Sequence, residues 1–314
     1  MFSDRKNLTS FLVIILSLPS FLVNILLKLF MVFLQYAAIK QEETNMKELG
    51  KMLTETAPEE ILKRNGKTAY PEFERHKYFS VTAGRETPVN ILLPCGYSED
   101  REYPVVYILH GYYCNQDWMA EDNVHIPEML ANLAAKNEAK EMIVVLPYIY
   151  CSKEMPCCTK MDTQNTLNYD NFINDLMTDL MPFVEKNFSA AKGRENTAVT
   201  GFSMGGRESL FIGISHPELF GYIGAVCPAP GLTRGTGDPW QLEEEQLKFD
   251  ENPPRLLLLS AAENDNVVED SPRRYKSIFD KNGTELLWHS MQRTGHDASS
   301  VTPHLYNFFR MIFR

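Results

Sequence analysis

A serine flanked by glycines carries the clearest chemical signal in the sequence. Ser203 lies at the centre of Gly201-Phe202-Ser203-Met204-Gly205, which fits the pattern Gly-x-Ser-x-Gly. A short strand is predicted before it at 197–200, and 203–214 has the spacing of a helix. On such a sharp turn the hydroxyl is exposed at the end of a sheet, and the first amides of the helix point at the reacting centre. The pattern predicts that Ser203 is a nucleophile.

A serine hydroxyl is a weak nucleophile at neutral pH, so it needs a general base. Of the seven histidines, His296 lies in Gly295-His296-Asp297, between a predicted strand at 286–291 and a predicted closing helix at 301–312. A loop beyond the last strand can bring an imidazole over the serine, and we expect His296 to be the base. Surface or core roles are expected for the histidines at 76, 125, 216, 289 and 304.

The imidazole in turn needs a carboxylate that fixes its tautomer and stabilises its charged form. The predicted strand at 255–259 runs into Ser260-Ala261-Ala262-Glu263-Asn264-Asp265, and Asp265 is the expected acid. Glu263, Glu269 and Asp270 are nearby alternatives, each of which can equally be a solvated charge. The chain order would then be nucleophile, acid, base.

Acyl transfer also requires N–H donors for the negative oxygen that forms during the reaction. The amide of Met204, directly after the serine, is one expected oxyanion donor. The other should come from the loop Leu109-His110-Gly111-Tyr112-Tyr113, and the amide of Tyr112 is our candidate. His110 is interpreted as support for this loop and not as the base.

The elements that must position these groups alternate along the chain. Strands are predicted at 76–81, 89–93, 104–109, 142–146, 197–200, 222–226, 255–259 and 286–291. Helices are predicted at 126–135, 171–187, 203–214, 272–281 and 301–312. This alternation predicts an α/β fold with a mostly parallel central sheet and helices on both faces. We expect 46–314 to be one catalytic domain. Within it, 151–167 is expected to be a loop, and 231–254 is expected to be surface chain that forms either a lid or a loop insertion.

Composition excludes several other classes of function. The net charge is −10 and no basic patch stands out, which argues against a nucleic-acid partner. No cofactor is expected, because phosphate-binding and dinucleotide-binding glycine motifs are absent. No metal site is expected either, because the cluster Cys151, Cys157 and Cys158 contains no C-x-x-C pair. Free thiols are expected there, with a Cys151–Cys157 disulfide as the alternative for an exported protein.

These motifs resemble carbohydrate esterase family 1, the feruloyl and acetyl-xylan esterases, and the related esterase D-like proteins of the α/β-hydrolase fold. The resemblance runs from about Phe73 to the end of the chain. It rests on the segments 107–111, 117–118, 201–206, 220–224, 264–265 and 295–297. It implies a serine esterase with Ser203, Asp265 and His296 as its triad. Two departures concern loop shape: Tyr113-Cys114 stands where the family often has Gly-Gly, and Ala262 replaces the usual glycine before the acid.

The resemblance implies a substrate that is an acylated plant polysaccharide or an oligosaccharide derived from one. Tyr112, Tyr113 and Trp118 lie on loops predicted at the carboxyl ends of strands, where we expect them to bind a feruloyl, acetyl or sugar group. Other small esters and thioesters, such as a siderophore ester or S-formylglutathione, are alternative substrates. Acyl transfer in place of hydrolysis is a further alternative, as is a non-catalytic binding protein on the same scaffold. The oligomeric state has no signal in the sequence.

Two interpretations of the first 45 residues are open. The stretch 11–38 is apolar and long enough to span a bilayer, and Arg5 and Lys6 precede it, which is typical of a membrane anchor with the esterase domain outside the cytoplasm. Alternatively, the codons for 41–45 can contain a bacterial ribosome-binding sequence ahead of Met46. Translation would then start at Met46, the preceding residues would be upstream DNA read as protein, and the enzyme would be cytoplasmic.

Overall fold

The computed structural model describes residues 22, 24, 25, 27, 28 and 46–314. The chain divides into two units, Met1–Lys47 and Glu48–Arg314, and the second contains all the elements discussed below. Most of the predicted apolar span at 11–38 lies outside the described residues. Within the described part of the chain, no helix has both the length and the apolar composition to cross a membrane.

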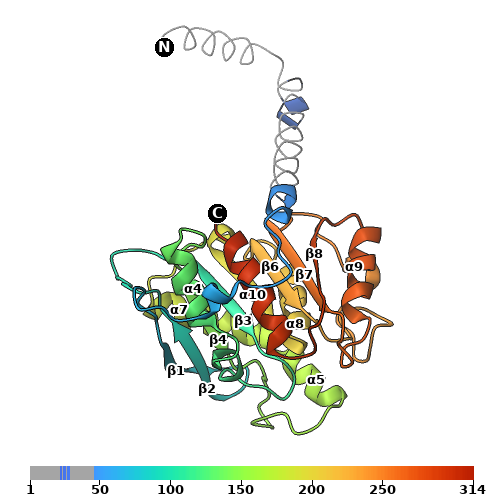
Figure 1. The fold of residues 1–314 in the computed structure, drawn as a ribbon. Coiled ribbons are helices and arrows are strands. Elements are labelled where there is room, and N and C mark those ends of the chain that lie inside the picture. The colour runs from blue at the N-terminus through green and yellow to red at the C-terminus, as the bar shows by residue number, and fades with distance from the viewer. Residues whose placement is uncertain (1–21, 23, 26, 29–45) are drawn as a thin grey trace. The chain divides into compact units, whose positions relative to one another are not determined.

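One sheet of eight strands forms the centre of Glu48–Arg314 (Figure 1). Its spatial order is β1-β2-β4-β3-β5-β6-β7-β8. β2 pairs antiparallel with both of its neighbours, β1 and β4, and all the other neighbouring strands in this order pair parallel. The strands are β1 (Phe73–Ser80), β2 (Arg85–Leu92), β3 (Val105–Leu109), β4 (Ile143–Pro147), β5 (Thr197–Gly201), β6 (Tyr222–Val226), β7 (Leu256–Ala262) and β8 (Leu287–Met291). The predicted α/β class with a mostly parallel sheet is confirmed.

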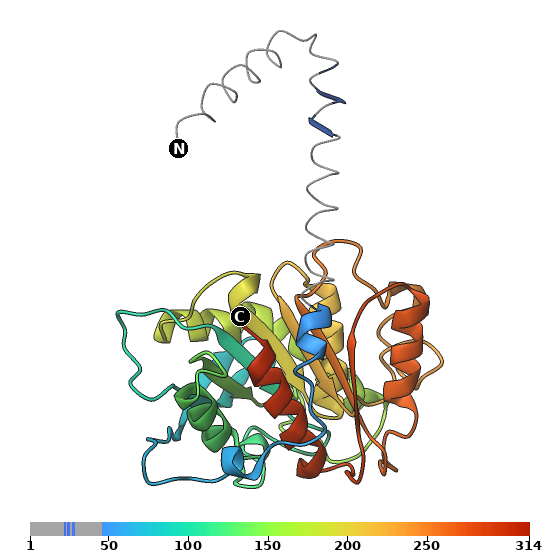
Figure 2. The same cartoon turned by 45° about the horizontal axis from the view of Figure 1, so that its top comes forward.

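Helices cover both faces of this sheet. On β6 the neighbouring residues Ile223 and Gly224 point to opposite faces. Ile223 meets Gly213 of α8 (Met204–Ser215), whereas Gly224 faces Phe308 of α10 (Ala298–Met311). The two helices therefore lie on opposite faces, and α10 crosses the front of the sheet in Figure 2. The other helices are α3 (Glu59–Leu62), α4 (Ile126–Ala135), α5 (Thr163–Asp170), α6 (Phe172–Asp175), α7 (Met181–Asn187) and α9 (Ser271–Lys281).

Three segments differ from the sequence-based expectation. The helix predicted at 171–187 is interrupted by a π-helical turn, Leu176–Leu180, just before Pro182, which cannot donate a backbone hydrogen bond. The predicted loop at 151–167 overlaps the first turn and a half of α5. Asp162 caps this helix, because its side-chain Oδ1 accepts a hydrogen bond from the Asn165 amide at 2.9 Å. The segment 231–254 is not only surface, because Leu232 and Leu247 are fully buried in it.

The turn between β5 and α8 is possible because two glycines allow backbone to approach backbone. A Cβ on Gly201 would lie 2.4 Å from the carbonyl oxygen of Gly205. A Cβ on Gly205 would lie 2.2 Å from the carbonyl oxygen of Leu109, at the end of β3. Neither contact is sterically allowed, so the start of α8 can touch β3 and β5 only with glycine at both positions.

Gly205→Ala is expected to destabilise the fold by about 1–3 kcal/mol, because the new methyl group must push α8 away from Leu109. Gly66→Ala is the matched control, since a Cβ there meets nothing within 4 Å. Thermal or urea unfolding of both variants measures the difference. Equal stability of the two variants would contradict the steric argument.

Candidate active site

Ser203 lies at the carboxyl edge of the sheet, in the turn from β5 to α8. Its backbone has φ 56° and ψ −115°, a conformation that a non-glycine residue adopts only under constraint. The constraint consists of hydrogen bonds, because its amide donates to the Val226 carbonyl at 3.0 Å and its carbonyl accepts from the Ala229 amide at 2.9 Å. The turn is therefore fixed to the end of β6 as well as to β5.

Ser203, His296 and Asp265 form one hydrogen-bonded row. The Ser203 hydroxyl lies 2.9 Å from Nε2 of His296, and Nδ1 of His296 lies 2.7 Å from Oδ2 of Asp265. His296 lies between β8 and α10, and Asp265 follows β7. The structure thus brings together the three residues that the sequence analysis selected, from three separate loops at one edge of the sheet.

The carboxylate of Asp265 is held in its ionised form although its side chain is only 3% exposed. Burial opposes ionisation, but the hydrogen bond from His296 and the amides of Val267 and Val268 outweigh it and keep the pKa below its usual value. The two amides donate to Oδ1 at 2.8 and 3.2 Å. The competing carboxylates are placed elsewhere: Glu263 pairs with Arg273, and the Asp270 side chain is 91% exposed.

His110 fixes the orientation of the peptide after Gly111. Its Nδ1 lies 2.8 Å from the Gly111 carbonyl oxygen, and its Nε2 lies 3.1 Å from the Ile149 amide nitrogen. A carbonyl can only accept and an amide can only donate, so His110 is neutral with its proton on Nδ1. Burial lowers its pKa to about 4, which agrees with this neutral form. In a trans peptide the N–H points away from the C=O, so the Tyr112 amide points away from His110.

The two expected oxyanion donors flank Ser203. A Cβ on Gly111 would lie 3.3 Å from the Cβ of Ser203, so the loop that carries the Tyr112 amide passes directly beside the serine. The amide of Met204 is the first of α8 and has no acceptor within the helix. The arrangement can therefore present two backbone donors next to a reacting carbonyl group.

Aromatic side chains lie against His296 and in the oxyanion loop. Trp118 stacks on Phe202 with ring centroids 5.1 Å apart, and Phe202 contacts the His296 ring at 4.5 Å. Tyr112 packs against Tyr169 at 4.7 Å, whereas Tyr113 is 55% exposed. Sequence reasoning did not single out Phe202, because the second position of the Gly-x-Ser-x-Gly pattern admits any residue.

A cavity of about 360 Å³ opens beside the oxyanion loop. Tyr113, Tyr148 and Tyr150 line it together with Gln116, so it has aromatic walls and a polar amide, whereas the three residues of the hydrogen-bonded row do not line it. Cys114, Cys157 and Cys158 also line it. All six cysteines are free in the structure, and the Cys151–Cys157 disulfide, which was the alternative for an exported protein, is not formed.

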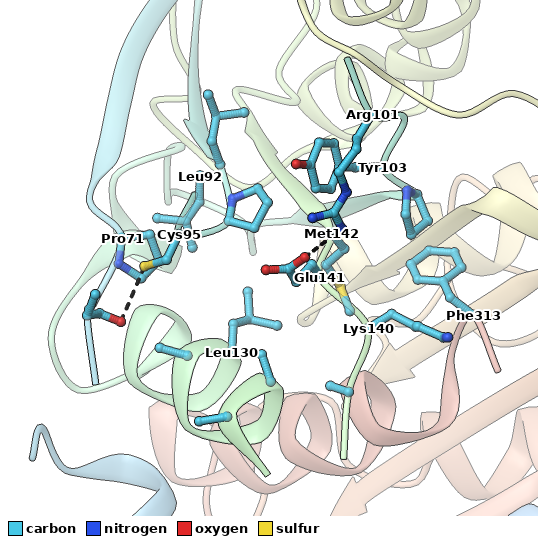
Figure 3. Close-up of a pocket in the computed structure, with 18 of the residues that line it drawn as sticks. Pro71, Leu92, Cys95, Arg101, Tyr103, Leu130, Lys140, Glu141, Met142 and Phe313 are labelled. Atoms are coloured by element: carbon cyan, nitrogen blue, oxygen red, sulfur yellow. Dashed lines mark hydrogen bonds and ion pairs between the residues drawn. The ribbon is translucent and has the colours of Figure 1, made fainter. Parts of the chain in front are cut away.

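A larger cavity, of about 790 Å³, lies at the opposite edge of the sheet (Figure 3). It adjoins Tyr103 and Met142, which come just before β3 and β4, and the ion pair between Arg101 and Glu141 crosses it. Ser203, Asp265 and His296 lie at the other edge of the sheet, in the loops that follow the carboxyl ends of β5, β7 and β8. Five residues of strand separate the two edges by roughly 17 Å. This larger cavity is therefore distinct from the candidate active site.

The chain is similar in sequence and fold to known esterases. Residues 80–269, more than half of the chain, match the family described as "Putative esterase". A ferulic acid esterase of carbohydrate esterase family 1 from Anaeromyces mucronatus, whose structure contains ferulic acid, is 36% identical with a TM-score of 0.79. That match covers 83% of this chain and 97% of the fungal chain. The feruloyl esterase module of Clostridium thermocellum, complexed with sinapinate, is 16% identical with a TM-score of 0.66. This match covers 83% of this chain and 94% of the module, and at this identity it shows the fold alone.

One curated relative is the endo-1,4-beta-xylanase/feruloyl esterase of Xylanibacter ruminicola, which is 29% identical over 168 residues. The match covers 52% of this chain but only 22% of the relative. The family match, the extent of the 36% identical structure and the eight-stranded sheet point to one assignment: the chain belongs to this esterase family and is a carboxylic ester hydrolase of the α/β-hydrolase fold.

Proposed function

We propose that the enzyme is a serine esterase that removes feruloyl or acetyl groups from plant polysaccharide or its oligosaccharides. The observation that carries the chemistry is the hydrogen-bonded row from Ser203 through His296 to Asp265. The substrate class is supported by the relatives named ferulic acid esterase and xylanase/feruloyl esterase. The aromatic cavity beside the oxyanion loop supports an acyl group with a ring.

In this proposal the reaction has two steps, each of which passes through a tetrahedral intermediate. Ser203 Oγ attacks the ester carbonyl carbon while Nε2 of His296 takes the hydroxyl proton. The amides of Tyr112 and Met204 donate to the oxygen that becomes negative. His296 then gives its proton to the leaving sugar alcohol, and the acyl group stays on Ser203. Water attacks this acyl-enzyme with His296 again as the base, which releases the carboxylic acid and restores the serine.

Asp265 acts through His296 in this scheme. Its carboxylate accepts from Nδ1–H, which leaves the lone pair of Nε2 facing the serine. When the imidazole becomes positive, the adjacent buried carboxylate stabilises that charge. The carboxylate keeps its own negative charge, because three hydrogen bonds hold it in the ionised form.

Ser203→Ala is expected to abolish labelling by a fluorophosphonate probe and to lower kcat by at least about a thousandfold. Ser215→Ala is the matched control, because Ser215 is an exposed serine on the last turn of the same helix. Mass spectrometry of the labelled peptide and ester hydrolysis assays measure both effects. Labelling of Ser203→Ala at the wild-type level would exclude this serine as the nucleophile.

His110→Asn is expected to lower kcat with little change in KM, because the Gly111–Tyr112 peptide loses its anchor and the Tyr112 donor loses its orientation.

The same variant should change the pH dependence of the free energy of unfolding. The folded-state pKa of His110, about 4, lies below the unfolded value of about 6.5, so its contribution is complete above pH 6.5 and is lost as the pH falls towards 4. Urea unfolding at several pH values should show a slope smaller by about 1.4 kcal/mol per pH unit in the variant across this window. An unchanged slope would contradict the neutral, buried state of His110.

Tyr113→Ala is expected to raise KM for methyl ferulate about tenfold and to leave 4-nitrophenyl acetate hydrolysis nearly unchanged, because only the feruloyl ring needs the aromatic wall. Phe79→Ala is the control, since Phe79 is 62% exposed on β1 and does not line this cavity. Kinetics on both esters and on acetylated xylan test the acyl preference. If both esters respond equally to Tyr113→Ala, the cavity does not hold the feruloyl group.

A further inference from the structure

Cys227 lies against the two ionisable members of the row, and the proposed reaction does not use it. It follows β6 directly, with φ 46° and no exposed surface, and its amide donates to the Ser260 carbonyl at 2.9 Å. One ligand atom from each of Cys227, Asp265 and His296 lies within 4.8 Å of the other two. Among the described residues, this is the only such group of three metal-binding side chains.

A thiolate, an imidazole and a carboxylate together form a donor set that suits zinc. Bonds of about 2.3 Å to sulfur and about 2.0–2.2 Å to nitrogen and oxygen place tetrahedral ligand atoms roughly 3.3–3.6 Å apart. The Asp265–His296 separation of 2.7 Å would have to open slightly, and the Cys227 sulfur already lies within 4.8 Å of a ligand atom of each partner. These are side-chain adjustments, and three protein ligands would leave a fourth position for water.

We propose that a borderline-soft divalent cation such as Zn²⁺ binds Cys227, Asp265 and Nδ1 of His296, and that it thereby inhibits the esterase reversibly. The inhibition, though not the binding, rests on the proposed role of His296 as the base. The bound ion occupies the place of the proton that Nδ1 now donates to Asp265. Because a neutral imidazole keeps one proton, that proton moves to Nε2, which faces Ser203. Nε2 can then no longer accept the hydroxyl proton, and the serine loses its base.

Binding of the ion releases one proton to solvent. Asp265 is already ionised, His296 only moves its proton from Nδ1 to Nε2, and the Cys227 thiol loses its proton when its sulfur binds the ion.

The decisive experiment is inhibition of the full-length enzyme by ZnCl₂ in a weakly coordinating buffer at pH 7. Wild type should lose activity and should recover it after addition of a chelator. Cys227→Ser and Cys227→Ala should each need at least about tenfold more Zn²⁺, since even loss of a group that only orients a ligand costs that much affinity. Cys95→Ser is the matched control, because this thiol is exposed and lines the cavity at the opposite edge of the sheet.

Co²⁺ absorption provides a readout that does not depend on catalysis. Wild type and Ser203→Ala should both develop a thiolate-to-cobalt charge-transfer band, and the two Cys227 variants should not. Equal Zn²⁺ sensitivity of Cys227→Ser and wild type, or absence of the band in wild type, would overturn the metal site. A wild type that shows the band but hydrolyses no ester would instead overturn the proposed function.

Discussion

The contact between the start of α8 and the ends of β3 and β5 is the constraint on which the whole site depends. Glycine at 201 and 205 lets these backbones touch, and no larger residue fits at either position. Since the helix begins in contact with both strands, the chain has to turn within a single residue. Ser203 takes that turn at φ 56°, and its hydrogen bonds to the end of β6 hold it there. The strain is local, and the surrounding sheet maintains it.

Parallel strands explain how residues far apart in the sequence meet at this turn. The loops after β5, β7 and β8 all leave the same edge of the sheet, so Ser203, Asp265 and His296 need only short loops to reach one another. Burial of the Asp265 charge is the principal cost. Two backbone amides and His296 compensate for it, so the carboxylate stays ionised with its side chain almost wholly inside the protein. The two backbone amides and the His296 imidazole therefore have two effects. They fix the position of the Asp265 carboxylate, and they offset the cost of burying its charge.

Sequence patterns predicted the features that depend on local composition. Apolar runs such as 105–109 and 143–147 became buried strands, and the order of serine, aspartate and histidine followed the strand order. The polar helix α5 was missed because its signal is a single cap, Asp162, rather than an apolar face. Cys227 was not singled out from the sequence, because its neighbours at the site come from the loops after β7 and β8. Contacts of that kind exist only once the sheet is assembled.

Behind the serine, a buried cluster of charges joins α8 to the chain around it. Arg207 is fully buried, and its guanidinium contacts Asp170 at the end of α5, Glu208 on α8, and the Gly231 carbonyl. Glu208 in turn accepts from Gln241 at 3.1 Å. Burying such charges costs free energy that an apolar cluster would avoid, so stability alone does not account for them. An apolar cluster could not supply directed hydrogen bonds. Here such bonds fix the end of α5 and the segment around 231–241 to α8, the helix that begins after Ser203. The segment around 231–241 is thereby attached to α8, so displacement of this segment has to break the hydrogen bonds that Gly231 and Gln241 make to Arg207 and Glu208.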